Sequence, residues 1–235
     1  MKQGRLSVGV IGTEPAGIAM AQALATAGHM VVAVSTATLE KDDALEVLLP
    51  QAKRLSEPQI LEAADLVLLA VPAAEITATV SNLSDSWRAG QLVVHLAAEY
   101  DHEILSDAFA KGAIPLAIHP AMRFTGTSLD LNRMKESFFA VSAPAVALPI
   151  AQALVIEMGA EPIVIASSAR ASYAEAIEVA SNFSAMIVNQ AIGLLEQAGV
   201  ENPALVIAPV IESAVDQALS KGHRQIKPED LIGDA

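Results

Sequence analysis

The feature that most constrains the fold is an alternation, in the first half of the chain, between short β-branched runs and segments with helical periodicity. This alternation is typical of parallel strands joined by right-handed crossovers, because parallel neighbours cannot be joined by a tight turn. The predicted strands lie at residues 7–11, 30–35, 66–71, 91–96 and 114–119, with helices at 17–27, 57–63 and 102–110. Two later apolar runs, 138–142 and 162–165, flank a predicted helix at 146–158 and extend the same sheet.

A second pattern occupies residues 168–198, where apolar side chains recur three or four positions apart. This spacing predicts one long helix. Gly199 is typical of a helix end, and Asn202 followed by Pro203 predicts the N-cap and first turn of another helix that ends near Gly222.

The long predicted helix is also apolar on a second face, at Phe183, Met186, Ile192 and Leu195. Either packing within the chain or a partner subunit must cover this face, and few residues remain in the chain to do so. We therefore expect a homodimer formed mainly through the C-terminal helices.

Composition excludes several classes of protein. Apolar residues make up 53% of the chain and charged residues 17%, which excludes disorder. With no cysteine and five scattered histidines, we expect no disulfide and no metal site. A net charge of −13 and unclustered basic residues disfavour a nucleic-acid partner. The longest apolar runs are too short to span a membrane, and no signal-peptide pattern is present, so we expect a cytoplasmic protein.

A glycine-containing segment lies at the first junction between strand and helix, where dinucleotide-binding folds place a Gly-x-Gly-x-x-Gly turn. Aligned on this pattern, Gly12 forms the tight turn and Gly17 allows the helix to pack closely on the strand. Thr13 and Ala16 complete the predicted cofactor-binding turn.

The middle glycine of this turn is replaced by Glu14, which adds bulk and negative charge where a pyrophosphate would approach, and Pro15 removes one N–H donor. Acidic residues and proline are also ordinary in the first turn of any helix. A carboxylate that filled the anion site would act as an internal substitute for phosphate. We expect weak or absent binding of a nicotinamide nucleotide.

The preference between NAD and NADP depends on the end of the second predicted strand. Ser35 and Thr36 stand where an acidic residue would bind the ribose 2′-hydroxyl of NAD, and their hydroxyls suit the 2′-phosphate of NADP. No arginine follows, and Lys41 is the nearest cation, so NADP is favoured only weakly. Val71 and Pro72 end the third strand at the edge where cofactors bind, although they equally suit an ordinary core strand with a proline stop.

The segment AIHPAMRFTGT at residues 117–127, together with Asp130 and Leu131, resembles a bacterial family of Rossmann-like proteins with a helical C-terminal domain. Most members are assigned as oxidoreductases. The family is similar in architecture to pyrroline-5-carboxylate reductase, ketopantoate reductase, and the 6-phosphogluconate and 3-hydroxyisobutyrate dehydrogenases. The resemblance extends over nearly the whole chain and is specific for the family, not for a reaction.

The resemblance implies an α/β fold: a Rossmann-type, mostly parallel sheet domain in residues 1–166 and an all-helical dimerisation domain in residues 167–235, with an active cleft between them. Asn182 matches the asparagine with which the hydroxyacid dehydrogenases hold substrate. Those relatives place a catalytic lysine four residues earlier, where this chain has Glu178. Further departures from the family pattern lie at Ala97-Ala98, at Arg123, and at residues 226–228 and 232–234.

The candidate catalytic residues are His119 and Asn182. His119 suits a general acid, because its ordinary pKa of about 6.5 populates both forms near neutral pH; a histidine before proline also commonly bonds a neighbouring loop. Arg123 and Thr125 are candidates to hold an anionic substrate group, Arg123 by a bidentate clamp. Alternatively, Arg123 pairs with Glu14 or with a surface acid. Asn182 either orients substrate or is a satisfied core amide.

Two functional hypotheses follow. The first is an NAD(P)-dependent oxidoreductase that transfers hydride between the nicotinamide and a small carbonyl or hydroxy compound, with His119 as proton donor. The second is a catalytically silent Rossmann-type dimer that binds a metabolite or a protein partner. Glu14 and Glu178 favour the second hypothesis.

Overall fold

The computed structural model describes residues 5–35 and 45–222. Thr36, Lys41 and the segments 226–228 and 232–234 lie outside the described residues. The chain divides into two compact units, Met1–Ile177 and Glu178–Ala235, so the division falls later than the expected boundary after residue 166.

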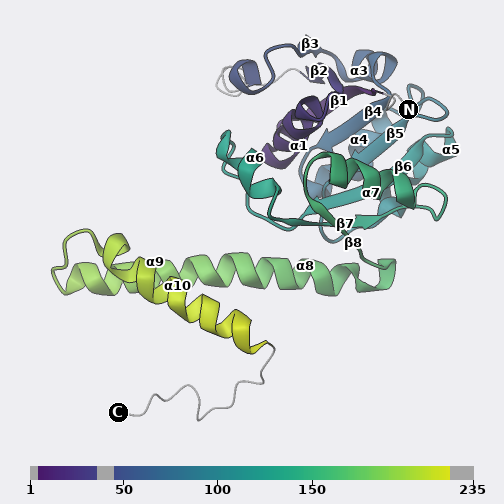
Figure 1. The fold of residues 1–235 in the computed structure, drawn as a ribbon. Coiled ribbons are helices and arrows are strands. Elements are labelled where there is room, and N and C mark those ends of the chain that lie inside the picture. Colours follow the sequence, from purple (N-terminus) through teal and green to yellow (C-terminus); the bar gives the residue numbers. More distant parts are fainter. Residues whose placement is uncertain (1–4, 36–44, 223–235) are drawn as a thin grey trace. The chain divides into compact units, whose positions relative to one another are not determined.

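The first unit is built on an eight-stranded sheet with the order β3-β2-β1-β4-β5-β6-β7-β8 (Figure 1). Every neighbouring pair is parallel except β6 and β7, which are antiparallel. All seven predicted strands are present, and the short β3 was not predicted. The strands are β1 (Ser7–Gly12), β2 (Met30–Ser35), β3 (Lys53–Leu55), β4 (Leu66–Ala70), β5 (Leu92–His95), β6 (Ile114–Pro120), β7 (Phe138–Ser142) and β8 (Glu161–Val164).

The order of the strands reverses beside β1. From β1 the chain continues outward to β2 and β3 and then crosses back to β4 on the other side of β1. Ligands in open parallel sheets bind at the carboxyl ends of the strands at such a switch point. β4 is buried along its whole length, as a central strand covered on both faces must be.

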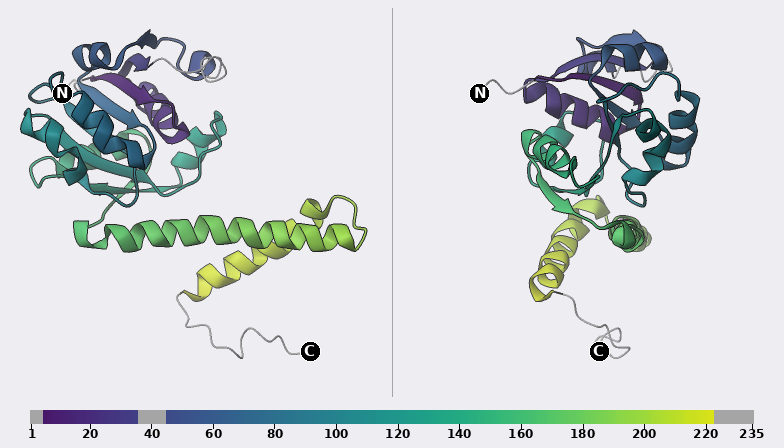
Figure 2. Two further views of the ribbon diagram at one scale, coloured as in Figure 1. Left: turned by 180° about the vertical axis from the view of Figure 1, so that it is seen from behind. Right: turned by 90° about the vertical axis from the view of Figure 1, so that its right-hand side faces the viewer.

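Helices cover both faces of this sheet (Figure 2). Alternate residues of β4 enter two separate cores: Leu66 and Leu68 pack with α1 and α7, whereas Val67 and Leu69 pack with α3 and α4. The helices of the first unit are α1 (Pro15–Thr26), α3 (Glu57–Ala63), α4 (Ile76–Asn82), α5 (Ser106–Ala110), α6 (Leu129–Met134) and α7 (Leu148–Glu157), with short 3₁₀ segments η1 (Ala73–Glu75), η2 (His102–Leu105) and η3 (Ser167–Ala169).

The predicted long helix is confirmed, but it contains an unpredicted π-helical turn. It comprises α8 (Arg170–Glu178), the π turn η4 (Val179–Phe183) and α9 (Ser184–Gln197), and α10 (Pro203–Lys221) follows. Gly199, at a φ of 77°, ends the long helix as predicted. Asn202 is the N-cap of α10 and Pro203 lies in its first turn, as predicted, but Asn202 has the left-handed conformation and its side chain makes no capping hydrogen bond.

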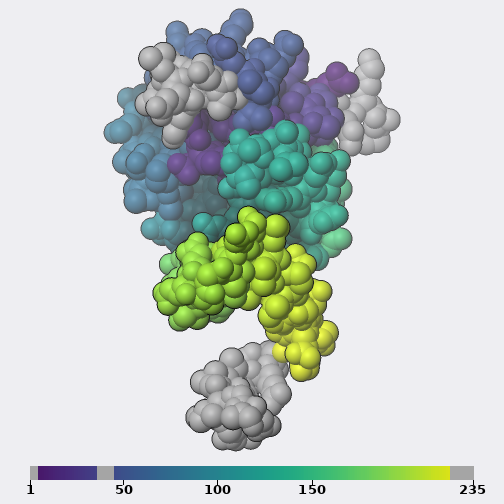
Figure 3. All heavy atoms as spheres, turned by 90° about the vertical axis from the view of Figure 1, so that its left-hand side faces the viewer, coloured from purple at the N-terminus to yellow at the C-terminus, as the bar shows by residue number. Residues whose placement is uncertain are grey.

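The second unit buries little of its apolar surface. Neither α9 nor α10 contains a buried residue, although the two helices pack together (Figure 3). Phe183, Met186, Leu194, Leu205 and Leu219 are all exposed. Among the described helices, none combines the length and hydropathy needed to cross a membrane.

Candidate functional site

The turn between β1 and α1 accepts only glycine at two positions. Gly12 has a φ of 92°, and a Cβ atom there would lie 2.1 Å from the carbonyl oxygen of Ala70. A Cβ atom at Gly17 would lie 2.3 Å from the Cβ of Ala70. Gly12 therefore makes the tight turn and Gly17 brings α1 against β4, the two roles that the glycine pattern assigns.

Glu14 occupies the N-cap position of α1 with an ordinary extended backbone, φ −62° and ψ 135°. Its N–H donates to the carbonyl of Ala70 at 2.9 Å, and its carbonyl accepts from the N–H of Gly17 at 3.0 Å. The backbone thus needs no glycine here. The Glu14 side chain makes no capping hydrogen bond, so the idea that it fills the anion site as an internal substitute for phosphate is wrong.

Ser35 ties the end of β2 to the glycine turn, because its hydroxyl accepts the N–H of Gly12 at 2.9 Å. Val71 lies on the other side of the turn, with its Cγ1 2.7 Å from the place where a Gly12 Cβ would be. Pro72 follows as the N-cap of η1. The carboxyl ends of the strands therefore bring Gly12, Ser35 and Val71 together.

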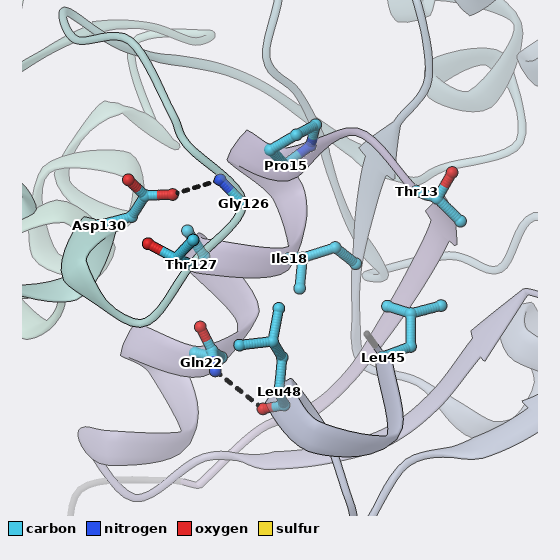
Figure 4. Close-up of a pocket in the computed structure, with 10 residues that line it drawn as sticks. Thr13, Pro15, Ile18, Gln22, Leu45, Leu48, Gly126, Thr127 and Asp130 are labelled. Atoms are coloured by element: carbon cyan, nitrogen blue, oxygen red, sulfur yellow. Dashed lines mark hydrogen bonds between the residues drawn. The ribbon is translucent and has the colours of Figure 1, made fainter. Parts of the chain in front are cut away.

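A cavity of about 250 Å³ lies beside this turn, between the first turns of α1, the helical residues 45–48 and the loop that precedes α6 (Figure 4). Gln22 lines one side and donates to the carbonyl of Leu48 at 2.9 Å. The lining residues are Thr13, Pro15, Ile18, Ala19, Gln22, Leu45, Leu48, Gly126, Thr127 and Asp130.

The loop beside this cavity is held by Asp130, which is fully buried. Its carboxylate accepts the N–H of Thr125 at 3.0 Å and the N–H of Gly126 at 2.9 Å. Burial acts to raise the pKa of Asp130, but the hydrogen bonds from Thr125, Gly126 and Thr127 outweigh it and hold that pKa below its usual value. The Thr125 hydroxyl also donates to Asp130, so in this structure Thr125 shapes the loop.

His119 lies at the carboxyl end of β6 and is paired with Tyr173 of α8. Its Nδ1 is 2.7 Å from the Tyr173 hydroxyl, and the rings meet edge to face with centroids 5.5 Å apart. Burial, together with the positive charge of Arg170, lowers the pKa of His119 to about 4. The imidazole is therefore neutral at pH 7, and the premise that both of its forms are populated there is wrong.

Two further buried polar groups lie near this pair. His95, at the end of β5, contacts the carbonyl of Asp101 through Nε2 at 2.8 Å and accepts the N–H of Ala97 at Nδ1; burial lowers its pKa to about 4. Arg170 is 2% exposed, and its Nη2 donates to the hydroxyl of Ser142 at 3.0 Å. Within the described part of the chain, its Nε and Nη1 have no hydrogen-bond partner.

Sequence reasoning missed His95, Arg170 and Tyr173 as site residues. His95 carries a signal that could have found it, since it lies next to the carboxyl end of a predicted strand, much as His119 does. Tyr173 has the spacing of an apolar helix position. Arg170 has no such signal, because a charged residue in a helical segment is nearly always exposed.

The remaining predicted residues are Asn182 and Arg123. Asn182 is in the second unit, on the π turn, and its Nδ2 is 3.4 Å from the Glu178 carboxylate. Arg123 is exposed and follows β6 in the first unit. No group of three His, Asp or Glu residues within 5–35 and 45–222 is placed to hold a metal ion.

A nicotinamide dinucleotide fits this edge in backbone shape. The turn at Gly12, the packing at Gly17 and the hydroxyl of Ser35 would hold its phosphates and ribose. Glu14 opposes the phosphates by charge, and Pro15 offers no N–H. The backbone geometry therefore accommodates a dinucleotide at this edge.

Several solved structures share the fold. They include a protein from Bacteroides fragilis that is described, by assignment only, as an NADP oxidoreductase (19% identity, TM-score 0.73, 91% of this chain and 80% of that one). Another is a 1-pyrroline-5-carboxylate reductase from Streptococcus pyogenes (14% identity, TM-score 0.70, 97% of this chain and 83% of that one). A third is an imine reductase from Streptomyces aurantiacus (22% identity, TM-score 0.67, 89% of this chain and 73% of that one). No curated protein sequence matches the chain.

Two family models match the sequence. A model described as a domain of unknown function (DUF2520) matches residues 137–227. The model of the Rossmann-like domain matches residues 1–120, which is about half of the chain. This match agrees with the glycine turn and the sheet order, and the chain belongs to the Rossmann-like domain family.

Proposed function

We propose that this protein is an NAD(P)-dependent oxidoreductase that transfers hydride between a nicotinamide and a small carbonyl, imine or hydroxy compound. The observation that carries the proposal is that two features lie at the same carboxyl end of the parallel strands. β1, β4, β5 and β6 are parallel neighbours, so the glycine turn after β1 and the pair of His119 and Tyr173 after β6 lie at the same edge. Solved relatives that reduce carbon–nitrogen double bonds support the imine class.

The test has two steps. Calorimetric titration with NADPH and NADH measures whether and how tightly each cofactor binds. Turnover is then followed by the loss of reduced-nicotinamide absorbance with a panel of small ketones, oxo acids and cyclic imines. Oxidation of cofactor that depends on one of these compounds supports the proposal, whereas binding without turnover supports the silent alternative that Glu14 and Glu178 favour.

We also propose that two copies of the chain associate through α9 and α10. Neither helix contains a buried residue, and within the described part of the chain many of their large apolar side chains are exposed. A second copy presents the same face through a two-fold axis, so one patch satisfies both chains. The cytoplasmic location, and the absence of a nucleic-acid or membrane partner, stay predictions from the sequence.

A further inference from the structure

We propose that Tyr173 is the proton donor of this site and that Arg170 supplies the positive charge that compensates its loss of a proton. The inference rests on the proposed function and adds two residues that the sequence pattern did not assign. Tyr173 and Arg170 are three positions apart on α8 and therefore lie on one face of that helix. Both belong to the first unit, as His119 does.

His119 is neutral at pH 7, because burial lowers its pKa to about 4. A neutral imidazole has no imidazolium proton to deliver at pH 7, so its contact with Tyr173 at 2.7 Å must serve another purpose. In the tautomer with hydrogen on Nδ1, His119 donates to the Tyr173 oxygen. The phenolic O–H is then directed away from His119 and is available to another atom.

The guanidinium of Arg170 is buried, and its Nε and Nη1 have no hydrogen-bond partner among the described residues. A buried cation of this kind stabilises a neighbouring negative charge more strongly than it would in water. Its positive charge lowers the pKa of Tyr173, although burial is the larger effect and raises that pKa to about 12. The carboxylate of Asp101, whose negative charge acts to raise the pKa of Arg170, accepts a hydrogen bond from the N–H of Glu103.

A reduced nicotinamide, when bound, supplies a hydride to the carbon of the substrate double bond. The electron pair of that bond moves to the oxygen or nitrogen, which takes the proton as the O–H bond of Tyr173 breaks. The phenolate left on Tyr173 is balanced by the charge of Arg170 and regains a proton from solvent through His119.

The charge relationship can be tested without any substrate. Nitrotyrosine placed at position 173 absorbs visible light on ionisation and titrates at milder pH than tyrosine, and Arg170 and His119 are the groups that act on it. We expect Arg170→Met to raise the titration midpoint by about 1–3 pH units, and Arg170→Lys, which keeps the charge, to leave it nearly unchanged. Equal midpoints in the two variants, both folded by circular dichroism, would overturn the role of Arg170.

The donor role is tested by kinetics. We expect Tyr173→Phe to lower kcat by about 10²–10⁴-fold with NADPH binding unchanged, and Tyr100→Phe, at the other tyrosine of the chain, to leave both unchanged. An active wild type with an active Tyr173→Phe variant overturns this inference alone. A wild type that turns over no member of the substrate panel overturns the proposed function itself.

Discussion

The carboxylate of Asp130 accepts both the backbone N–H and the hydroxyl of Thr125, at 3.0 and 2.9 Å, and so holds the loop that borders the cavity beside the glycine turn. We expect Asp130→Asn to lower the free energy of unfolding by about 1–3 kcal/mol, because an amide offers one acceptor atom in place of two charged ones. Urea unfolding measures this difference.

The matched control for Asp130 is Asp85→Asn. Asp85 pairs with Lys111 at 3.4 Å on the surface, where its side chain is 98% exposed, and such pairs contribute little to stability. If both variants unfolded at the same urea concentration as the wild type, the loop would not depend on Asp130.

The proposed dimer depends on apolar side chains of α9 and α10. We expect Leu194→Glu to shift the protein towards monomer, because it places a charge on a face that the second copy would bury. Val146→Glu is the control, since Val146 is even more exposed but lies in the first unit. Sedimentation velocity at low micromolar protein measures the state. A folded wild type that sediments as a monomer would refute the dimer.

Much of the sheet could be predicted, because a buried parallel strand needs an apolar run and each of these runs can be recognised in the sequence. β3 could not be predicted in this way. Its three residues, Lys53, Arg54 and Leu55, form a short, charged edge strand, whose role is set by pairing with β2 and not by burial. The π turn at Val179–Phe183 also lacks a local signal, since its residues suit an ordinary α-helix.

The candidate site likewise contains one part that a local sequence motif predicts and one part that only the folded chain brings together. The glycine turn is a local motif, so the spacing of Gly12 and Gly17 predicts its geometry. The cluster around Arg170 joins α8 to β6 and β7, and only the folded sheet brings these segments together. Burial of His119 in this cluster lowers its pKa to about 4, so the ordinary pKa of 6.5 that was expected for this residue was wrong.

Acid stability should depend on the two buried histidines. Burial lowers the pKa values of His95 and His119 from 6.5 to about 4, so the unfolded chain binds more protons than the folded one between these pH values. The free energy of unfolding should therefore rise with pH from about 4 to 6.5 and level off above. Arg170 acts on both histidines and keeps its charge throughout this range.

The variant that tests this is His119→Gln, which keeps a hydrogen-bonding group beside Tyr173. We expect it to reduce the slope of stability against pH by at most one proton, about 1.4 kcal/mol per pH unit. Urea unfolding at a series of pH values measures the slope. An unchanged slope would mean that His119 is protonated alike in the folded and unfolded chains.

Replacing Glu14 should strengthen the weak cofactor binding that we expect of the wild type. We expect Glu14→Gln to bind NADPH several-fold to tenfold more tightly, because removing one charge near a phosphate contributes on the order of 1 kcal/mol in a partly solvated site. Glu14→Gly should gain at least as much, since it also removes bulk, and Glu14→Gly with Pro15→Arg adds a cation. The backbone at Glu14 is ordinary for any residue, so these changes should leave the turn intact.

Calorimetric titration with NADPH compares these variants with Glu161→Gln, which makes the same change in net charge on the edge strand β8. A gain at Glu14→Gln that is absent at Glu161→Gln assigns the effect to local repulsion. A gain at Glu14→Gly alone assigns it to steric exclusion. If neither Glu14 variant binds NADPH better while both remain folded, the glycine turn is not what prevents binding. The catalytically silent dimer then explains this Rossmann-like chain better than the oxidoreductase does.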